Sequence, residues 1–66
     1  MTDFGRRLKK CRDRKGMSRE ALSEVCGLHR QAVRRYERGE QEPKLSALVA
    51  LADFLDVSVD WLAGRK

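Results

Sequence analysis

The chain has 66 residues, enough for one small domain, which we expect to span residues 1–66. Fifteen Lys and Arg oppose ten Asp and Glu, so the net charge is +5 and the pI is about 9.8. The size excludes a two-domain enzyme, and the charge favours a polyanionic partner.

The charge is concentrated in the first part of the chain. Residues 1–38 carry 12 basic and 5 acidic side chains, a net charge of +7. Residues 39–66 carry 3 basic and 5 acidic side chains, a net charge of −2. We therefore expect the first part of the chain to face the anion.

Membrane and secretion signals are missing from the sequence. The longest apolar run, residues 47–52, is far shorter than a membrane span. The charged residues 1–15 lack the apolar core of a signal peptide. We expect a cytoplasmic protein with no membrane partner.

Residues that carry catalytic or metal chemistry are few. Cys11, Cys26 and His29 are too few and too scattered for a metal site, so we interpret both cysteines as reduced core residues. His29 has no nucleophile at a recognisable spacing, and we find no phosphate-binding glycine loop and no paired carboxylates. We expect no enzymatic activity, no cofactor, no metal and no small-molecule ligand.

The apolar residues follow a helical period in every segment between glycines, and no stretch alternates like a strand, so the predicted fold is all-α. The first helix covers residues 3–15, with Phe4, Leu8 and Cys11 on its buried face and Gly16 after its end. Its other face is interpreted mainly as a solvated one, made of Arg6, Arg7, Lys9, Lys10 and Arg14.

Two short helices are predicted within residues 18–39. Ser18 is a good N-cap for the first of them, and Gly27 stops it after about two turns. The second covers about residues 30–37 and ends at Gly39. The apolar residues that mark the buried faces and the turn are Leu22, Val25, Cys26, Leu28, Val33 and Tyr36.

A polar loop, residues 40–43, leads to a fourth helix and then a short fifth helix. Asp56 stands where we expect a glycine with a left-handed φ. Ser58 is predicted to cap the last helix, with Gly64 after its end. The apolar arc of the fourth helix consists of Leu45, Leu48, Leu51, Ala52 and Leu55.

Residues 19–38 have the arrangement of a helix-turn-helix, in which a glycine-containing turn packs the second helix across the first. The residues left outward on the second helix are Arg30, Gln31, Arg34, Arg35 and Arg38. Arginines at i, i+4 and i+8 repel one another on a bare helix, so this row indicates an anion that compensates them.

The segment Met17–Leu62, with YERG at 36–39 and VSVDWL at 57–62, resembles the helix-turn-helix domain of the lambdoid phage repressors and Cro, the XRE family. The resemblance covers essentially the whole chain. It implies a compact five-helix, lambda-repressor-like domain that places its third helix in the major groove. It also implies that the domain binds a pseudo-palindromic operator in double-stranded DNA as a dimer.

Individual roles follow from the resemblance position by position. Base contacts are implied for Arg30, Gln31 and Arg35. Because arginine matches guanine and glutamine matches adenine, we expect at least one G and one A in each half-site. A structural ion pair is implied between Arg12 and Glu37. Phosphate contacts are implied for Arg12, Ser18, Arg19, Arg34, Arg38 and Lys44, and for His29 as one of three options with helix capping or neither.

Three positions depart from the family pattern. Arg19 replaces a common Gln, which should steepen the salt dependence of DNA binding. Ser23 replaces a small Ala, a tolerable change if its hydroxyl bonds to the carbonyl one turn earlier. The acidic loop at residues 40–42 replaces basic phosphate contacts, which weakens the backbone clamp beside Lys44.

We expect a sequence-specific transcriptional regulator of the repressor type that acts as a homodimer. The expected dimer contact lies around Phe54, Val59 and Trp61, because a chain this short has little apolar burial of its own.

An antitoxin that represses its own operon is the alternative, although no segment is spare to wrap a toxin. An RNA-binding or membrane-surface peptide is disfavoured, since the core uses the apolar residues. Whether the chain is a full-length protein or part of a longer one stays open.

Overall fold

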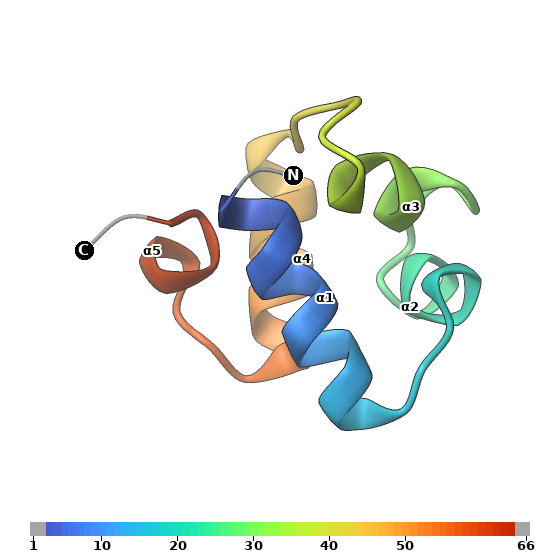
Figure 1. Cartoon of the computed structure of the whole chain (residues 1–66), viewed down its shortest axis with the longest axis horizontal. Helices are drawn as coiled ribbons and strands as arrows, with labels where there is room; N and C mark the ends of the chain where they lie inside the picture. Colours follow the sequence, from blue (N-terminus) through green and yellow to red (C-terminus); the bar gives the residue numbers. More distant parts are fainter. Residues whose placement is uncertain (1–2, 65–66) are drawn as a thin grey trace.

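The computed structural model describes residues 3–64. These residues form α1 (Asp3–Lys15), α2 (Arg19–Val25), α3 (Ala32–Glu37), α4 (Leu45–Leu55) and α5 (Val59–Leu62). Within this range there is no strand, so the predicted all-α fold is confirmed. Helices α2 and α3 lie to one side of α1 and α4, and α5 lies to the other (Figure 1).

Each helix contributes a fully buried apolar side chain to a shared core. These side chains are Leu8, Leu22, Val33, Leu51 and Leu62. The flanking residues Phe4, Phe54 and Trp61 are partly buried and pack against this core. Helices this short depend on such packing, because their own hydrogen bonds do not stabilise them in water.

Signals at the ends of α1, α2, α4 and α5 act as predicted. The hydroxyls of Ser18 and Ser58 each accept a hydrogen bond at 3.0 Å from the backbone N–H three residues later, which caps α2 and α5. Gly16 ends α1 with φ +65°. Asp56 ends α4 with φ 58° and adopts the left-handed conformation expected at this position.

Two predictions of buried apolar residues are wrong. Val25 is 53% exposed and Leu45 is 71% exposed. In α2 the buried side chains are Leu22 and Ser23, whereas Val25 is the last residue of the helix and stays exposed. Leu45, the first residue of α4, lies two residues before the buried Ala47 and so faces the opposite side of the helix.

None of the helices in residues 3–64 is long and apolar enough to cross a membrane.

Candidate nucleic-acid interface

Helices α2 and α3 pack against each other across a tight turn. Gly27 takes φ +71°, a left-handed conformation that redirects the chain after α2. The N–H of Leu28 then donates to the carbonyl of Ser23 at 2.8 Å and closes the end of α2. The turn therefore holds the helix pair that the sequence predicts.

Helix α3 starts later than predicted, at Ala32 instead of near residue 30. The N–H of Ala32 donates to the carbonyl of His29 at 2.9 Å, which makes a tight turn in place of the first helical turn. The N–H of Gln31 donates to Nδ1 of His29 at 3.1 Å. The imidazole thus accepts a hydrogen bond in the turn before α3 but does not cap α3 itself, whose N-cap is Gln31.

Four exposed arginines lie along the turn, α3 and its C-terminal end. We call them the arginine set: Arg30, Arg34, Arg35 and Arg38. Arg38 pairs with Glu40, with 2.9 Å between Nε and Oε2. Among residues 3–64, no carboxylate forms an ion pair with the other three. Because Arg30 precedes α3 and Arg38 is its C-cap, only Arg34 of the predicted helical row of three arginines lies within α3. The uncompensated charge is available to an external anion.

A shallow hollow of about 240 Å³ lies within this region. Its lining brings together two predicted base-contacting residues, Gln31 and Arg35, but not the third, Arg30. The rest of the lining is Arg34, Arg38 and Glu40. Guanidinium groups present forked donors that match a phosphate or the O6 and N7 atoms of guanine.

Four residues predicted to contact phosphate are exposed outside α3: Ser18, Arg19, His29 and Lys44. Ser18 and Arg19 stand at the start of α2, and Lys44 is the N-cap of α4. Helix N-termini favour negative charge, so these positions suit a phosphate. Their contact with DNA stays a prediction, as do the phosphate contacts of Arg34 and Arg38.

The ion pair implied between Arg12 and Glu37 is present. Nε and Nη2 of Arg12 donate to the two carboxylate oxygens at 2.8 and 3.1 Å, while Nη1 donates to the carbonyl of Met17 at 2.8 Å. The two side chains are only 12% and 4% exposed. The hydrogen bond to Glu37 raises the pKa of Arg12, against the opposing effect of burial. The pair ties α1 to the end of α3, and the phosphate contact of Arg12 stays a prediction.

The interpretation of the basic face of α1 as solvated is wrong for Arg7. Its guanidinium lies 5.0 Å from the ring centroid of Trp61 and donates to the Trp61 carbonyl at 2.5 Å. Lys15 lies similarly over Phe54, at 5.1 Å. With Val59, both rings are partly buried against the core. The predicted dimer contact is thus partly covered within the chain, and it stays a prediction.

Two residues outside α3 support its position: Gly5, which the sequence did not reveal, and Ser23, for which it suggested only part of the role. A Cβ atom at Gly5 of α1 would lie 2.9 Å from the carbonyl oxygens of Tyr36 and Glu37. A glycine inside a helix is the sequence signal for such a close approach. The Ser23 hydroxyl donates to the carbonyl of Arg19 at 2.9 Å, which meets the condition stated for this residue, and it also accepts from the N–H of Val33 at 3.1 Å.

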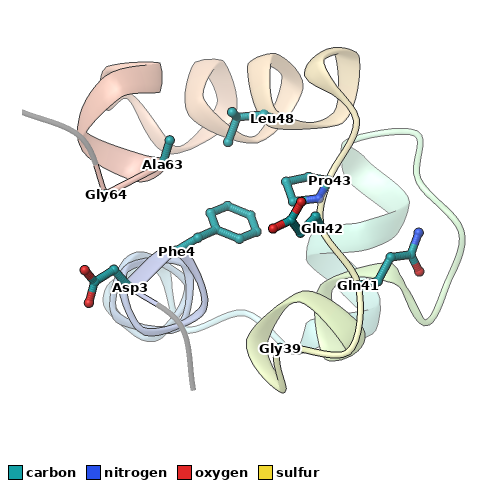
Figure 2. Close-up of a pocket in the computed structure, with 9 residues that line it drawn as sticks. All are labelled: Asp3, Phe4, Gly39, Gln41, Glu42, Pro43, Leu48, Ala63 and Gly64. Carbon is teal, nitrogen blue, oxygen red and sulfur yellow. The ribbon is translucent and has the colours of Figure 1, made fainter.

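A larger hollow, of about 390 Å³, is lined by other residues. Figure 2 shows Phe4 of α1 pointing into the space between Leu48 of α4 and Pro43 of the preceding loop. The described residues in its lining include two acids, Asp3 and Glu42, and no Lys or Arg. Its lining therefore differs in charge from the arginine set and does not suit a polyanion.

The sequence matches known proteins over most of its length. A family model described as helix-turn-helix matches residues 8–62. The SPbeta prophage-derived HTH-type transcriptional regulator YonR of Bacillus subtilis (strain 168) is 46% identical over 59 residues, 89% of this chain and 55% of that protein. Control protein C.SmaI of Serratia marcescens is 42% identical over 50 residues, 76% of this chain and 60% of that protein. The chain thus spans little more than half the length of these relatives.

Two solved structures have the same fold. The P22 c2 repressor, crystallised in complex with a synthetic operator, superposes with a TM-score of 0.90 and 29% identity over 100% of both chains. The restriction-modification controller protein C.AhdI from Aeromonas hydrophila superposes with a TM-score of 0.82 and 38% identity over 91% of each chain. These similarities confirm the resemblance found in the sequence, and the chain belongs to the XRE-type helix-turn-helix family of the lambdoid phage repressors and Cro.

Proposed function

We propose that this chain binds double-stranded DNA at specific sequences and regulates transcription as a repressor. The observation that carries the proposal is the exposed arginine set, in which Arg30, Arg34 and Arg35 have no carboxylate partner among residues 3–64. A cluster of unpaired guanidinium groups suits the phosphate backbone of a nucleic acid. The regulators and the operator-bound repressor named above support the same function.

The N-terminal end of α3 enters the major groove in this proposal. Arg30 and Gln31 immediately precede α3, and recognition helices contact base edges with their N-terminal residues. Together with Arg35 they contact bases, whereas the predicted phosphate contacts fix the register of the protein on the duplex.

The proposal includes a homodimer on a pseudo-palindromic operator. The area around Phe54, Val59 and Trp61 is the proposed contact between copies, since these apolar side chains stay only partly buried in one chain. None of the relatives described above is named as an antitoxin, and that alternative has no observation of its own to support it.

Selection of bound duplexes from random DNA tests the proposal. We expect enrichment of a symmetric motif whose half-sites are centred about one helical turn apart and contain at least one G and one A. The affinity should fall steeply with salt, since several phosphates are neutralised. Absence of any enriched sequence would contradict the proposal.

A further inference from the structure

The first turn of α3 lacks a cap from its own N-cap residue. Gln31 stands at the N-cap and makes no side-chain cap bond. A capping side chain normally accepts from the N–H of the second or third helical residue, and the second here is Val33. That N–H donates instead to the hydroxyl of Ser23 in α2, at 3.1 Å. Helix α3 is thus capped by its neighbour across the turn.

The Ser23 hydroxyl has a fixed orientation because both of its hydrogen-bonding roles are used. Its single hydrogen is donated to the carbonyl of Arg19 at 2.9 Å, so a lone pair is left to accept from Val33. Ser23 and Val33 are both 0% exposed. Solvent water therefore has no access to replace the bond if the hydroxyl is removed.

This one hydroxyl connects two segments of the proposed interface. Arg19 is the predicted phosphate contact at the start of α2, and Val33 lies between the predicted base contacts Gln31 and Arg35. Since α3 has six residues, its direction is set by its neighbours more than by its own hydrogen bonds. Base recognition requires side chains to be held within about 0.5 Å of their working geometry.

We propose that Ser23 is a positioning residue for base recognition, which fixes the base-contacting turn of α3 relative to the phosphate contact of α2. The inference rests on the proposed function and deepens it. Removal of the hydroxyl loosens the first turn of α3 but leaves every arginine in place. Base discrimination therefore falls, while charge-driven attraction to any duplex persists.

The experiment compares three variants with the parent chain. Ser23→Ala removes the hydroxyl, and Ser23→Thr keeps a hydroxyl that can still bond to the carbonyl one turn earlier. Ser58→Ala is the control, because it deletes a helix-cap bond, here from the N–H of Trp61 in α5. Since α5 carries part of the proposed dimer contact, all variants are compared at a protein concentration at which each is dimeric. Affinities are measured at one salt concentration for the selected operator, for operators with one base changed, and for random duplex.

We expect Ser23→Ala to reduce the affinity ratio between operator and single-base variants by about fivefold or more. Its affinity for random duplex should change by less than about twofold, because no phosphate contact is lost. Ser58→Ala should keep the parent's ratios even if it is less stable. Ser23→Thr should also keep them, although its extra methyl group strains a full core. Base selectivity then depends on the hydroxyl of residue 23 and not on the stability of the variant.

Amide hydrogen exchange of the free protein is a readout that needs no DNA. The Val33 N–H should exchange faster in Ser23→Ala, relative to core amides of α4, than in the parent chain. If Ser23→Ala does not fold, Ser23→Cys replaces it, because a thiol is a weak donor and acceptor.

The outcomes separate this inference from the proposed function. Unchanged base ratios in Ser23→Ala, or ratios that fall equally in Ser58→Ala, overturn the role of Ser23 and leave the proposed function standing. A parent chain that discriminates no base overturns the proposed function and the inference together, and the parent measurement alone reveals it.

Discussion

Arg12 and Arg35 carry the same charge in opposite surroundings. Arg12 is 12% exposed and donates to both oxygens of Glu37 and to a backbone carbonyl. Arg35 is exposed on α3, and no carboxylate among residues 3–64 pairs with it. A charge leaves water only when a partner compensates it, whereas an exposed one keeps its donors for an external anion. Burial therefore separates arginines that hold the fold from arginines available to a ligand.

Arg12→Met gives the largest expected effect, because it leaves the carboxylate of Glu37 buried and unpaired. We expect a loss of about 3 to 5 kcal/mol in the free energy of unfolding. Urea denaturation followed by helical circular dichroism measures it. The matched control is Arg34→Met on the exposed face of α3, which should change the stability by less than about 0.5 kcal/mol.

If Arg12→Met is unfolded, a double variant tests whether the unpaired Glu37 carboxylate causes the loss of stability. Adding Glu37→Gln removes the orphaned charge, so the double variant should regain part of the lost stability. Equal stability losses for Arg12→Met and Arg34→Met would show that the two groups of arginines do not differ as the burial indicates.

Gly5→Ala is expected to have the next largest effect, because it separates α1 from the end of α3, where Glu37 is anchored. The new Cβ would meet two backbone carbonyl oxygens at 2.9 Å, and backbone atoms cannot move aside as a flexible side chain can. Strain of about 1 to 3 kcal/mol should outweigh the helix propensity gained. Thermal unfolding measures it, with Lys10→Ala on the same helix as the control. A Gly5→Ala variant as stable as the control would contradict this close approach.

The fold was predictable because its signals are local. Apolar spacing places Leu8, Val33 and Leu51 on buried faces, and Ser18 and Ser58 mark helix starts through bonds to residues three positions away. The errors at Val25 and Leu45 have a common cause. An apolar residue near a helix end counts toward the pattern, even though no neighbouring helix covers it.

The candidate site was less predictable because its contacts are long-range. The composition of α1 does not reveal that Arg7 reaches Trp61, 54 positions away. The sequence suggests that Ser23 can bond to its own helix but gives no sign of the bond to Val33, since the latter depends on how α2 crosses α3. The Arg12–Glu37 pair was foreseen from the family resemblance and not from spacing, because 25 positions separate the two residues.

Arg35→Ala tests the exposed arginine of the comparison between Arg12 and Arg35. We expect discrimination at one base position to relax by about 1 to 3 kcal/mol, with the free energy of unfolding unchanged. Arg19→Ala should instead weaken binding to all sequences alike and reduce the salt slope by about 1. Competition binding over a salt series distinguishes the two patterns. Equal losses on operator and random duplex for both variants would contradict the assigned division between base and phosphate contacts.

Glu40→Gln tests Arg38, the one member of the arginine set with a carboxylate partner among residues 3–64. The pair is half-exposed on both sides, so its loss should cost less than about 1 kcal/mol of stability. The released guanidinium can then neutralise a phosphate, and the salt slope of DNA binding should steepen by about 0.9. Glu42→Gln is the matched control, since it removes the same charge from the same loop without releasing an arginine. A tighter and more salt-dependent complex for Glu40→Gln alone would assign the gain to Arg38. Equal gains for both variants would attribute the effect to net charge and would contradict the release of Arg38 to a phosphate.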